Sequence, residues 1–310
     1  MQNTLKSSVR LDGIGLHGGR PARVTIRPAP ADHGIRFRRT DLPAGSGTIP
    51  ALWSSVVPSA LCTMLTNPSG ASVSTVEHLM AALAGCGIHN ALVEIDGPEV
   101  PILDGSAAPF VRAFLAAGLR RQRAALDVIR ILQPVEVREG AAHARLEPAE
   151  TLEIRFRIDF PDTAIGEQSL GLELGNGSFV RELSDSRTFC RMSDVESMLA
   201  NGLALGGTLE NAVVFDGEKI LNPGGLRRSD EPVRHKMLDA LGDLALAGAP
   251  ILGRYIGNRA GHALTNRLLH VLFTTPGAWQ RETCSTPVGR RLPGAGVCHA
   301  DLPATCREAA

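Results

Sequence analysis

One segment of the 310-residue chain places an imidazole and two carboxylates four residues apart, at His235, Asp239 and Asp243. The surrounding stretch, Asp230 to Leu246, has apolar side chains at helical spacing, and Pro232 suits the first turn of a helix. Four helical residues turn about 400° and rise about 6 Å, so the three side chains project from nearly one line. A histidine and a carboxylate at this spacing can bind one metal ion, and the next carboxylate can orient a neighbouring group. A solvated polar stripe is the alternative explanation.

A second pair of chemical groups, Glu77 and His78, lies in a predicted helix from Thr75 to Ala84. A zinc hydrolase needs three protein ligands, an open position for water, and a carboxylate that takes the proton of that water. Adjacent helical residues diverge by about 100°, so one of the two can ligate while the other reaches the water. Alternatively, Glu77 is the glutamate of a capping box that follows Ser74, and His78 packs on the apolar helix.

Two further residues would complete a zinc amidase. His262, in GHALTN, could act as a general acid if a carboxylate such as Asp243 keeps it protonated near neutral pH, or it could be a polar turn residue. Thr188 could donate its hydroxyl to an oxyanion, or could be an ordinary strand threonine. Cys62 has no nearby base in the sequence that would make it a nucleophile.

A glycine-rich motif near the N-terminus formally fits the dinucleotide fingerprint G-x-G-x-x-G, with Gly13, Gly15 and Gly18. That fingerprint requires a helix to follow, because the pyrophosphate sits on the helix N-terminus. Pro21 and an alternating strand pattern follow instead, so we predict a hairpin with His17 at its tip.

The elements that must position these groups alternate between strands and helices in both halves of the chain. Residues 121–127 form a charged junction between the halves, and the alternation of apolar and charged residues over 152–160 predicts a strand with one buried face. Residues 193–226 form an apolar, glycine-bearing insertion. From about Arg281 the sequence is rich in Pro, Gly, Ala and Arg without periodicity, which favours a mobile tail.

The overall composition narrows the classes of protein. Basic and acidic side chains number 32 each, and a net charge of zero argues against nucleic acid as the main partner. No apolar run reaches the length of a membrane span, and the N-terminal residues lack the apolar core of a signal peptide. Six cysteines without a C-x-x-C pair favour reduced thiols in a cytoplasmic protein.

Five motifs, GIGLHGG, TVEHLMAALAGCGIHNALVEIDGPEVPILDGSAAPFV, SRTF, HKMLDALGDLAL and GHALTN, occur in this order. They closely resemble the UDP-3-O-acyl-N-acetylglucosamine deacetylase family, which catalyses the committed step of lipid A synthesis in Gram-negative bacteria, over the chain as far as about Phe273. The resemblance implies an α+β fold of two similar two-layer α/β sandwich domains, packed helix layer to helix layer, each with a small insertion. The domains expected are 1–124 and 125–278, with the acyl-passage insertion at about 193–226 and a mobile tail at 279–310.

The resemblance also implies roles for individual residues. The residues matched to a zinc site with one ion per chain are His78, His235 and Asp239, and the two histidines and one carboxylate would also fit Fe²⁺. The residues matched to catalysis are Glu77 as general base, His262 as cationic acid or oxyanion stabiliser, Asp243 beside it, and Thr188 as oxyanion donor. The residues matched to substrate contacts are Lys236, Phe189, Leu61, Cys62 and Thr63.

We therefore expect a cytoplasmic, monomeric zinc deacetylase that removes the 2-acetamido acetyl group of UDP-3-O-(3-hydroxyacyl)-N-acetylglucosamine, without nucleic-acid binding or stable membrane insertion. One alternative is a zinc amidase for another N-acyl substrate, which activity on simple N-acetyl sugars would favour. The other is a binding module without catalysis. The presence of Glu77 beside a complete ligand set argues against a binding module, which has no physical need of a base.

Overall fold

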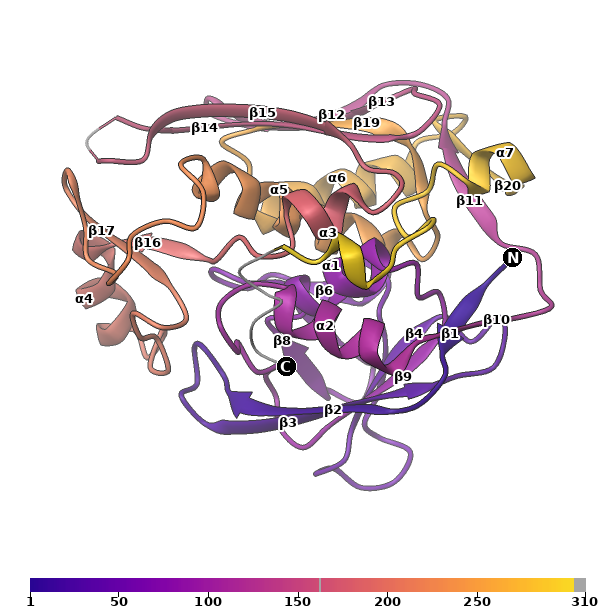
Figure 1. Cartoon of the computed structure of the whole chain (residues 1–310), viewed down its shortest axis with the longest axis horizontal. Coiled ribbons are helices and arrows are strands. Elements are labelled where there is room, and N and C mark those ends of the chain that lie inside the picture. Colours follow the sequence, from indigo (N-terminus) through magenta and orange to yellow (C-terminus); the bar gives the residue numbers. More distant parts are fainter. Residues whose placement is uncertain (162, 304–310) are drawn as a thin grey trace.

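A computed structural model describes residues 1–161 and 163–303. Two β-sheets form the outer layers, and helices from both halves of the chain lie between them (Figure 1). The predicted α+β fold class, with helix layer against helix layer, is confirmed. The proposed boundary between residues 124 and 125 falls in the connection between β10 and β11.

The first half contains a five-stranded sheet of order β2-β3-β9-β4-β5. Its strands are β2 (Val9–Ile14), β3 (Pro21–Pro28), β9 (Ala91–Ile95), β4 (Ile35–Arg39) and β5 (Thr48–Pro50). Its helices are α1 (Glu77–Gly85) and α2 (Ala108–Ala117). Smaller elements are β1 (Asn3–Leu5) paired with β10 (Leu119–Arg121), and the sheet of β6 (Val56–Val57), β7 (Met64–Thr66) and β8 (Ser72–Ser74). Strands β2 and β3 pair antiparallel around His17, so the predicted hairpin is confirmed and the dinucleotide fingerprint is excluded.

The second half contains a seven-stranded sheet in which β19 (Ile251–Asn258) is central. The other strands are β11 (Asp127–Ile131), β12 (Val135–Glu139), β13 (Ala142–Glu147), β14 (Leu152–Phe160), β15 (Gly166–Glu173) and β20 (Trp279–Thr283). The helices of this half outside the insertion and the C-terminal segment are α3 (Ser178–Glu182), α5 (Glu231–Leu244) and α6 (His262–Thr274). In β14, Leu152, Ile154 and Phe156 are buried as their alternation predicts, because successive side chains of a strand point to opposite faces.

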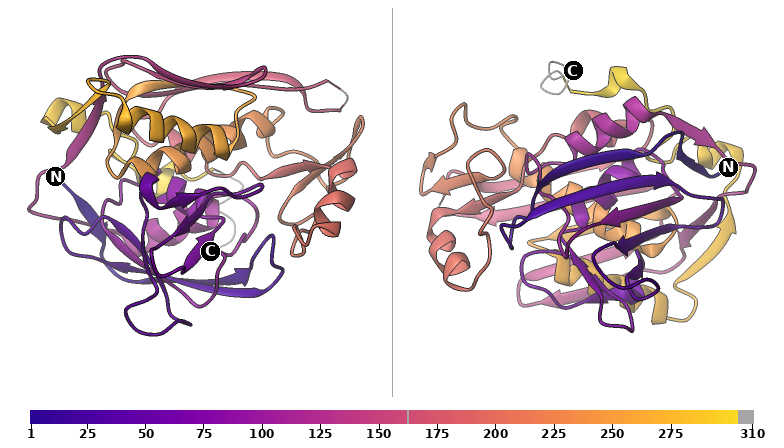
Figure 2. Two further views of the ribbon diagram at one scale, coloured as in Figure 1. Left: turned by 180° about the vertical axis from the view of Figure 1, so that it is seen from behind. Right: turned by 90° about the horizontal axis from the view of Figure 1, so that it is seen from below.

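The apolar insertion of the second half forms a small substructure of its own, which projects from one end of the layers (Figure 2). It contains β16 (Phe189–Arg191), α4 (Met192–Ala200), β17 (Val213–Asp216) and β18 (Lys219–Ile220). Because β16 pairs with β17, the substructure begins at Phe189, a few residues before the expected start at 193.

The expectation of a mobile tail over 279–310 is wrong for its first residues. Trp279–Thr283 form β20, which pairs antiparallel with β11 along its whole length. Backbone hydrogen bonds to an open strand edge do not require hydrophobic periodicity, and the sequence therefore gave no sign of this strand. Further on, α7 (Thr286–Gly289) and a 3₁₀ turn at His299–Asp301 follow, and Leu292 and Leu302 are buried. The rest of the expected tail, 304–310, lies outside the described residues.

The start of α1 differs from the prediction in a way that matters for Glu77. Thr75 has a positive φ of 57°, which removes it from the helix, and Val76 is the N-cap without a side-chain hydrogen bond. The carboxylate of Glu77 instead accepts the backbone N–H of Thr63 at 3.1 Å. The capping-box interpretation is therefore wrong, and Glu77 points toward a neighbouring loop.

Helices α1 and α5 approach so closely that Gly242 has no room for a side chain. A Cβ built on Gly242 would lie 2.0 Å from the carbonyl oxygen of Glu77. This approach brings Glu77 and His78 against the face of α5 that carries the histidine and carboxylates. The glycine is thus a requirement of the site as well as of the packing.

Substituting Gly242→Ala is expected to lower the free energy of unfolding by about 1–3 kcal/mol, because the new methyl group must displace backbone. The sign is diagnostic, since alanine in an unconstrained helix position would stabilise by about 0.5–1 kcal/mol. Denaturant unfolding measures the change. Gly97→Ala is the matched control, because no atom lies within 4 Å of a Cβ there. A more stable Gly242→Ala protein would contradict the close approach of the helices.

Candidate active site

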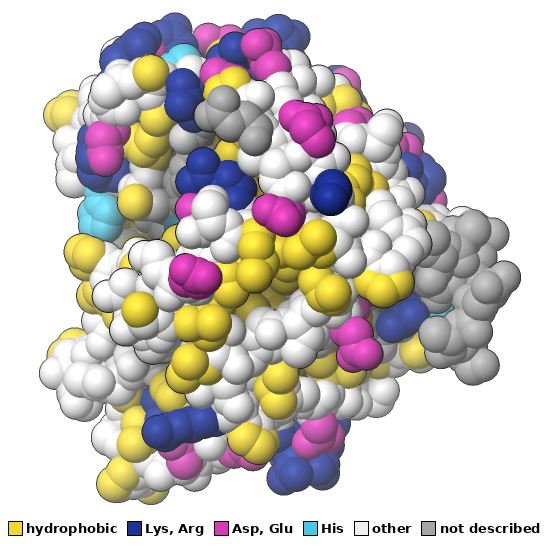
Figure 3. Space-filling view, turned by 90° about the vertical axis from the view of Figure 1, so that its left-hand side faces the viewer, with side chains coloured by type: hydrophobic (Ala, Val, Ile, Leu, Met, Phe, Trp, Pro, Cys, Tyr) yellow, Lys and Arg dark blue, Asp and Glu magenta, His cyan; other side chains and the backbone are white. Residues whose placement is uncertain are grey.

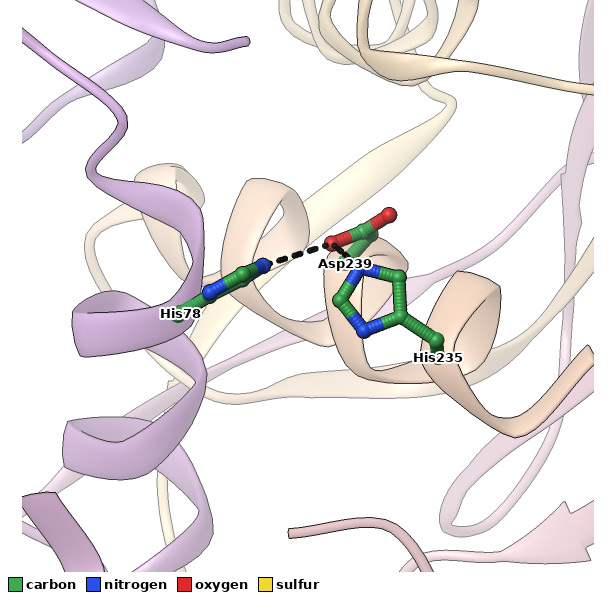
Figure 4. Close-up of side chains that lie close together, drawn as sticks. All are labelled: His78, His235 and Asp239. Carbon is green, nitrogen blue, oxygen red and sulfur yellow. Dashed lines mark ion pairs between the residues drawn. The ribbon is translucent and has the colours of Figure 1, made fainter. Parts of the chain in front are cut away.

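Three buried side chains from two helices meet at one point. His78 comes from α1, and His235 and Asp239 come from α5 (Figure 4). The Nε2 atoms of His78 and His235 lie 3.5 Å and 3.3 Å from Oδ1 of Asp239, and the two rings are nearly perpendicular. Within the described part of the chain, this Oδ1 is buried and accepts no hydrogen bond. An orphaned carboxylate oxygen between two imidazole nitrogens fits a shared cation.

The residues around this cluster orient its side chains and favour the protonation states that metal ligands need. Nδ1 of His235 donates to the carbonyl oxygen of Ser186 at 3.0 Å, so Nε2 presents its lone pair to the cluster. Burial lowers the pKa of His235 to about 4, which keeps the ring neutral near pH 7. Burial alone would raise the pKa of Asp239, but the basic groups around it, His235 and Lys236 first, lower it well below its ordinary value. The Lys236 ammonium donates to Oδ2 of Asp239 at 2.9 Å. A neutral imidazole and an ionised carboxylate are the forms that bind a divalent metal.

Glu77 is placed where it could receive a proton beside this cluster. Its side chain is buried, and burial is the main cause that raises its pKa above the ordinary value. One carboxylate oxygen accepts from Thr63, and the other, Oε1, lies 3.7 Å from Nε2 of His262. A carboxylate with a raised pKa is a better general base near neutral pH than an ordinary glutamate.

His262 is the first residue of α6, so the interpretation as a turn residue is wrong. Nδ1 of its ring donates to Oδ2 of Asp243 at 2.9 Å. Burial opposes the charged form, but Asp243, Glu77 and Asp239 raise the pKa of His262 to about 9. The ring is therefore cationic at neutral pH and could supply a proton or stabilise negative charge.

Of the remaining predicted residues, Phe189 and Thr63 contact members of this group. The ring of Phe189 lies 6.2 Å from that of His235 in an edge-to-face arrangement. The backbone N–H of Thr188 donates a hydrogen bond to the carbonyl oxygen of Gly105 at 2.8 Å, which fixes the backbone at this residue. Leu61 is half exposed and Cys62 is buried; burial raises the pKa of the Cys62 thiol, which agrees with its exclusion as a nucleophile. Thr63 contacts both Glu77 and Asp243.

His17 lies against the insertion of the second half. The Glu99 carboxylate holds the hairpin by accepting the backbone N–H groups of His17 and Gly18 at 2.7 Å and 2.8 Å. The carbonyl oxygen of His17 accepts the N–H of Leu205 at 3.2 Å. The hairpin therefore connects the first half to the insertion, a contact for which the sequence offers no local signal.

Sequence reasoning missed a buried ion pair that supports His235. Arg187 donates from Nε and Nη2 to the two carboxylate oxygens of Glu231 at 2.9 Å and 3.1 Å, and its backbone N–H also donates to this carboxylate. Glu231 lies one turn before His235 in α5, and Arg187 follows Ser186, which accepts the proton of His235. The two partners are far apart in the sequence, and no pattern joins them.

Replacing this carboxylate, Glu231→Gln, is expected to weaken metal affinity about tenfold, since the Ser186 carbonyl that orients His235 is no longer held by a charged pair. Competition with a chromophoric chelator measures the affinity without relying on activity. Glu218→Gln, at an exposed position, is the matched control. Equal affinities in the two variants would show that the ion pair does not position His235.

Among residues 1–161 and 163–303, no helix combines the length and apolar character that crossing a membrane requires.

An α+β protein whose helix interface holds a two-histidine, one-carboxylate cluster beside a buried glutamate and a cationic histidine has the components of a metal-dependent amide hydrolase. A family model described as "LpxC: UDP-3-O-acyl N-acetylglycosamine deacetylase" matches residues 2–274. A UDP-3-O-acyl-N-acetylglucosamine deacetylase from Phenylobacterium zucineum is 50% identical over 282 residues, covering 91% of this chain and 96% of the relative. Relatives of the same name from Shewanella frigidimarina and Shewanella halifaxensis are 45% and 43% identical and cover 95% and 96% of this chain and 98% of their own lengths. The chain belongs to this deacetylase family, whose members are amide hydrolases.

Proposed function

We propose that the protein is a zinc-dependent deacetylase that hydrolyses the 2-acetamido group of UDP-3-O-(3-hydroxyacyl)-N-acetylglucosamine, the committed step of lipid A synthesis. The observation that carries this proposal is the cluster of His78, His235 and Asp239 beside Glu77 and His262. It occurs in a chain that matches the deacetylase family from residue 2 to residue 274. We also propose that the protein works as a monomer in the cytoplasm.

His78, His235 and Asp239 would hold the zinc ion, and their buried nitrogen and carboxylate donors suit it. When bound, zinc lowers the pKa of water to about 7 and polarises a carbonyl oxygen. Two histidines and one carboxylate would also accept Fe²⁺, so metal analysis of protein purified without added metal belongs to the test.

The side chains of this protein would perform the proton transfers. Glu77 takes a proton from the attacking water while the oxygen of that water adds to the carbonyl carbon of the acetamido group. Thr188 donates a hydrogen bond to the oxyanion that results. The C–N bond then breaks, and His262 gives its proton to the departing nitrogen while Asp243 holds the ring in place. The products are the free amine and acetate.

The insertion would receive the acyl chain of the substrate. Hydrophobic side chains gather around a hollow on the side of the molecule where the insertion lies (Figure 3). Half of the ten large hydrophobic side chains found exposed in the described residues belong to this insertion: Met192, Leu199, Leu205, Leu209 and Leu221. The matched contacts to the sugar and diphosphate are Lys236 and Phe189, with Leu61, Cys62 and Thr63 lining the site.

The test is acetate release from UDP-3-O-acyl-N-acetylglucosamine by metal-replete protein, repeated after chelation and after zinc is added back. Activity that vanishes with the chelator and returns with about one zinc per chain supports reaction, substrate and cofactor together. UDP-N-acetylglucosamine without the acyl chain is the matched control substrate and is expected to react far more slowly. Equal rates on both substrates, or on simple N-acetyl sugars, would favour a different amidase, and no release from folded, replete protein would refute the proposal.

A further inference from the structure

Thr63 makes contact with both sides of the proposed proton-transfer machinery. The residue is buried, and it precedes β7 in the first half of the chain. Its backbone N–H donates to Oε2 of Glu77 at 3.1 Å. Its hydroxyl donates to Oδ1 of Asp243 at 2.6 Å, and the other oxygen of Asp243 accepts from His262. Thr63 is therefore hydrogen-bonded both to the candidate base, Glu77, and to the Asp243 carboxylate that holds the candidate acid, His262.

A fifth residue, Asn266 of α6, determines how the Thr63 hydroxyl is oriented. Nδ2 of the buried Asn266 lies 3.0 Å from Oγ1 of Thr63. An ionised carboxylate can only accept, so the single hydroxyl proton of Thr63 must point to Asp243. The lone pairs of the hydroxyl then face Asn266, which must present its NH₂ group. The hydrogen bonds consequently have one direction, from Asn266 to Thr63 to Asp243.

These bonds fix the plane of the Asp243 carboxylate. One of its oxygens is held by Thr63 and the other by His262, and the side chain is 1% exposed. The chain of bonds connects the loop before β7 with α5 and α6, so it crosses between the two halves. It can therefore hold Glu77 and His262 in a constant relation, with Oε1 of Glu77 3.7 Å from Nε2 of His262.

The backbone before Thr63 is strained. Leu61 has a φ of 67°, a left-handed conformation that costs a residue other than glycine about 1–3 kcal/mol and that clusters at functional sites. The contacts of the following residues must offset this cost. Thr63 lies two residues after Leu61, and its hydrogen bonds to Glu77 and Asp243 are contacts that can offset the cost of the left-handed conformation.

We propose that Thr63 is a positioning residue for catalysis, held by Asn266. It keeps the Glu77 carboxylate and the Asp243–His262 pair in a fixed relative position. The proposal rests on the proposed function and deepens it. It assigns to the Thr63 hydroxyl a role distinct from lining the substrate site, because that hydroxyl is already engaged by Asp243 and Asn266.

Steady-state kinetics of Thr63→Val, Thr63→Ser and Asn266→Leu separate the two roles. Thr63→Val keeps the shape and the backbone N–H but removes the hydroxyl, and we expect kcat to fall about 10- to 100-fold with little change in KM or zinc content. Thr63→Ser restores the hydroxyl and is expected to restore kcat. Asn266→Leu is expected to lower kcat less, and the double variant should be no slower than Thr63→Val, because both act through one chain of bonds. A raised KM with unchanged kcat in Thr63→Val would overturn the proposal, as would additive losses.

A spectroscopic readout tests the positioning without a substrate. In protein with ¹⁵N-labelled histidine, the Nδ1–H resonance of His262 is identified by its loss in His262→Gln. We expect this resonance to shift or broaden in Thr63→Val and to keep its position in Thr63→Ser, and an unchanged resonance in folded Thr63→Val would overturn the proposal. If wild-type protein releases no acetate, the proposed function fails, whereas this spectrum still decides whether Thr63 orients the Asp243–His262 pair. Should Thr63→Val not fold, Asn266→Leu gives the same comparison.

Discussion

Replacing Glu77 with glutamine is expected to lower kcat by about 100-fold or more while zinc content stays near one per chain. The carboxamide has the shape of the carboxylate and can still accept the N–H of Thr63, so the local structure is retained. The carboxamide cannot take a proton from water, however. The variant therefore lacks the base that the buried Glu77 carboxylate, with its raised pKa, provides. The loss should appear in kcat and in kcat/KM alike, because the proton is transferred in the transition state.

The measurement is steady-state acetate release together with elemental analysis of each protein. Glu218→Gln, an exposed glutamate in a turn, is the matched control and should keep both activity and zinc. If Glu77→Gln loses zinc along with activity, Glu77 is structural rather than a base. Undiminished turnover would remove it from the mechanism.

The substitution His235→Ala is expected to abolish activity by weakening metal binding more than about 100-fold. It removes one of the three donors of the cluster and leaves Oδ1 of Asp239 with a single imidazole nitrogen, that of His78, nearby. Metal bound to the folded state also stabilises it by mass action. Chelation should therefore lower the Tm of the wild-type protein and leave that of His235→Ala unchanged.

Thermal unfolding with and without chelator, together with metal titration, checks this second expectation. His143→Ala, on β13 of the outer sheet, is the matched control and should respond to chelator as the wild type does. A His235→Ala protein that binds one zinc with undiminished affinity would exclude His235 from the ligand set.

Local periodicity predicted several elements of this structure correctly. The spacing of four in His235, Asp239 and Asp243 follows from the 3.6-residue helical turn, which holds wherever the helix packs. The alternation in β14 and the hairpin around His17 follow in the same way from strand and turn geometry. The motif resemblance then assigned roles in the same site to His78 and His262, which were already candidates by residue type but which no local pattern connects with α5.

The predictions that failed did so because a tertiary contact overrode a local pattern. Glu77 follows Ser74 by three residues, as the glutamate of a capping box would, yet α1 begins at Glu77 and its carboxylate accepts the backbone N–H of Thr63 from another loop. The expected tail over 279–310 was predicted to be mobile, yet its first residues, Trp279–Thr283, form β20 and complete the edge of a sheet through backbone hydrogen bonds. In both cases a hydrogen-bonding group finds its partner in another segment of the chain, whereas the local sequence pattern had suggested a local partner or none.

The sequence by itself determined which residues share a face, because backbone geometry repeats along each helix and strand. Only the tertiary structure decided that His78 meets Asp239, that Gly242 lets α1 approach α5, and that Thr63 joins Glu77 to Asp243. These contacts depend on how separate elements pack, and packing between elements distant in the chain leaves no periodic trace in the sequence. The chemistry of the candidate site thus lies in residue types that the sequence displays, and its geometry lies in contacts that folding alone creates.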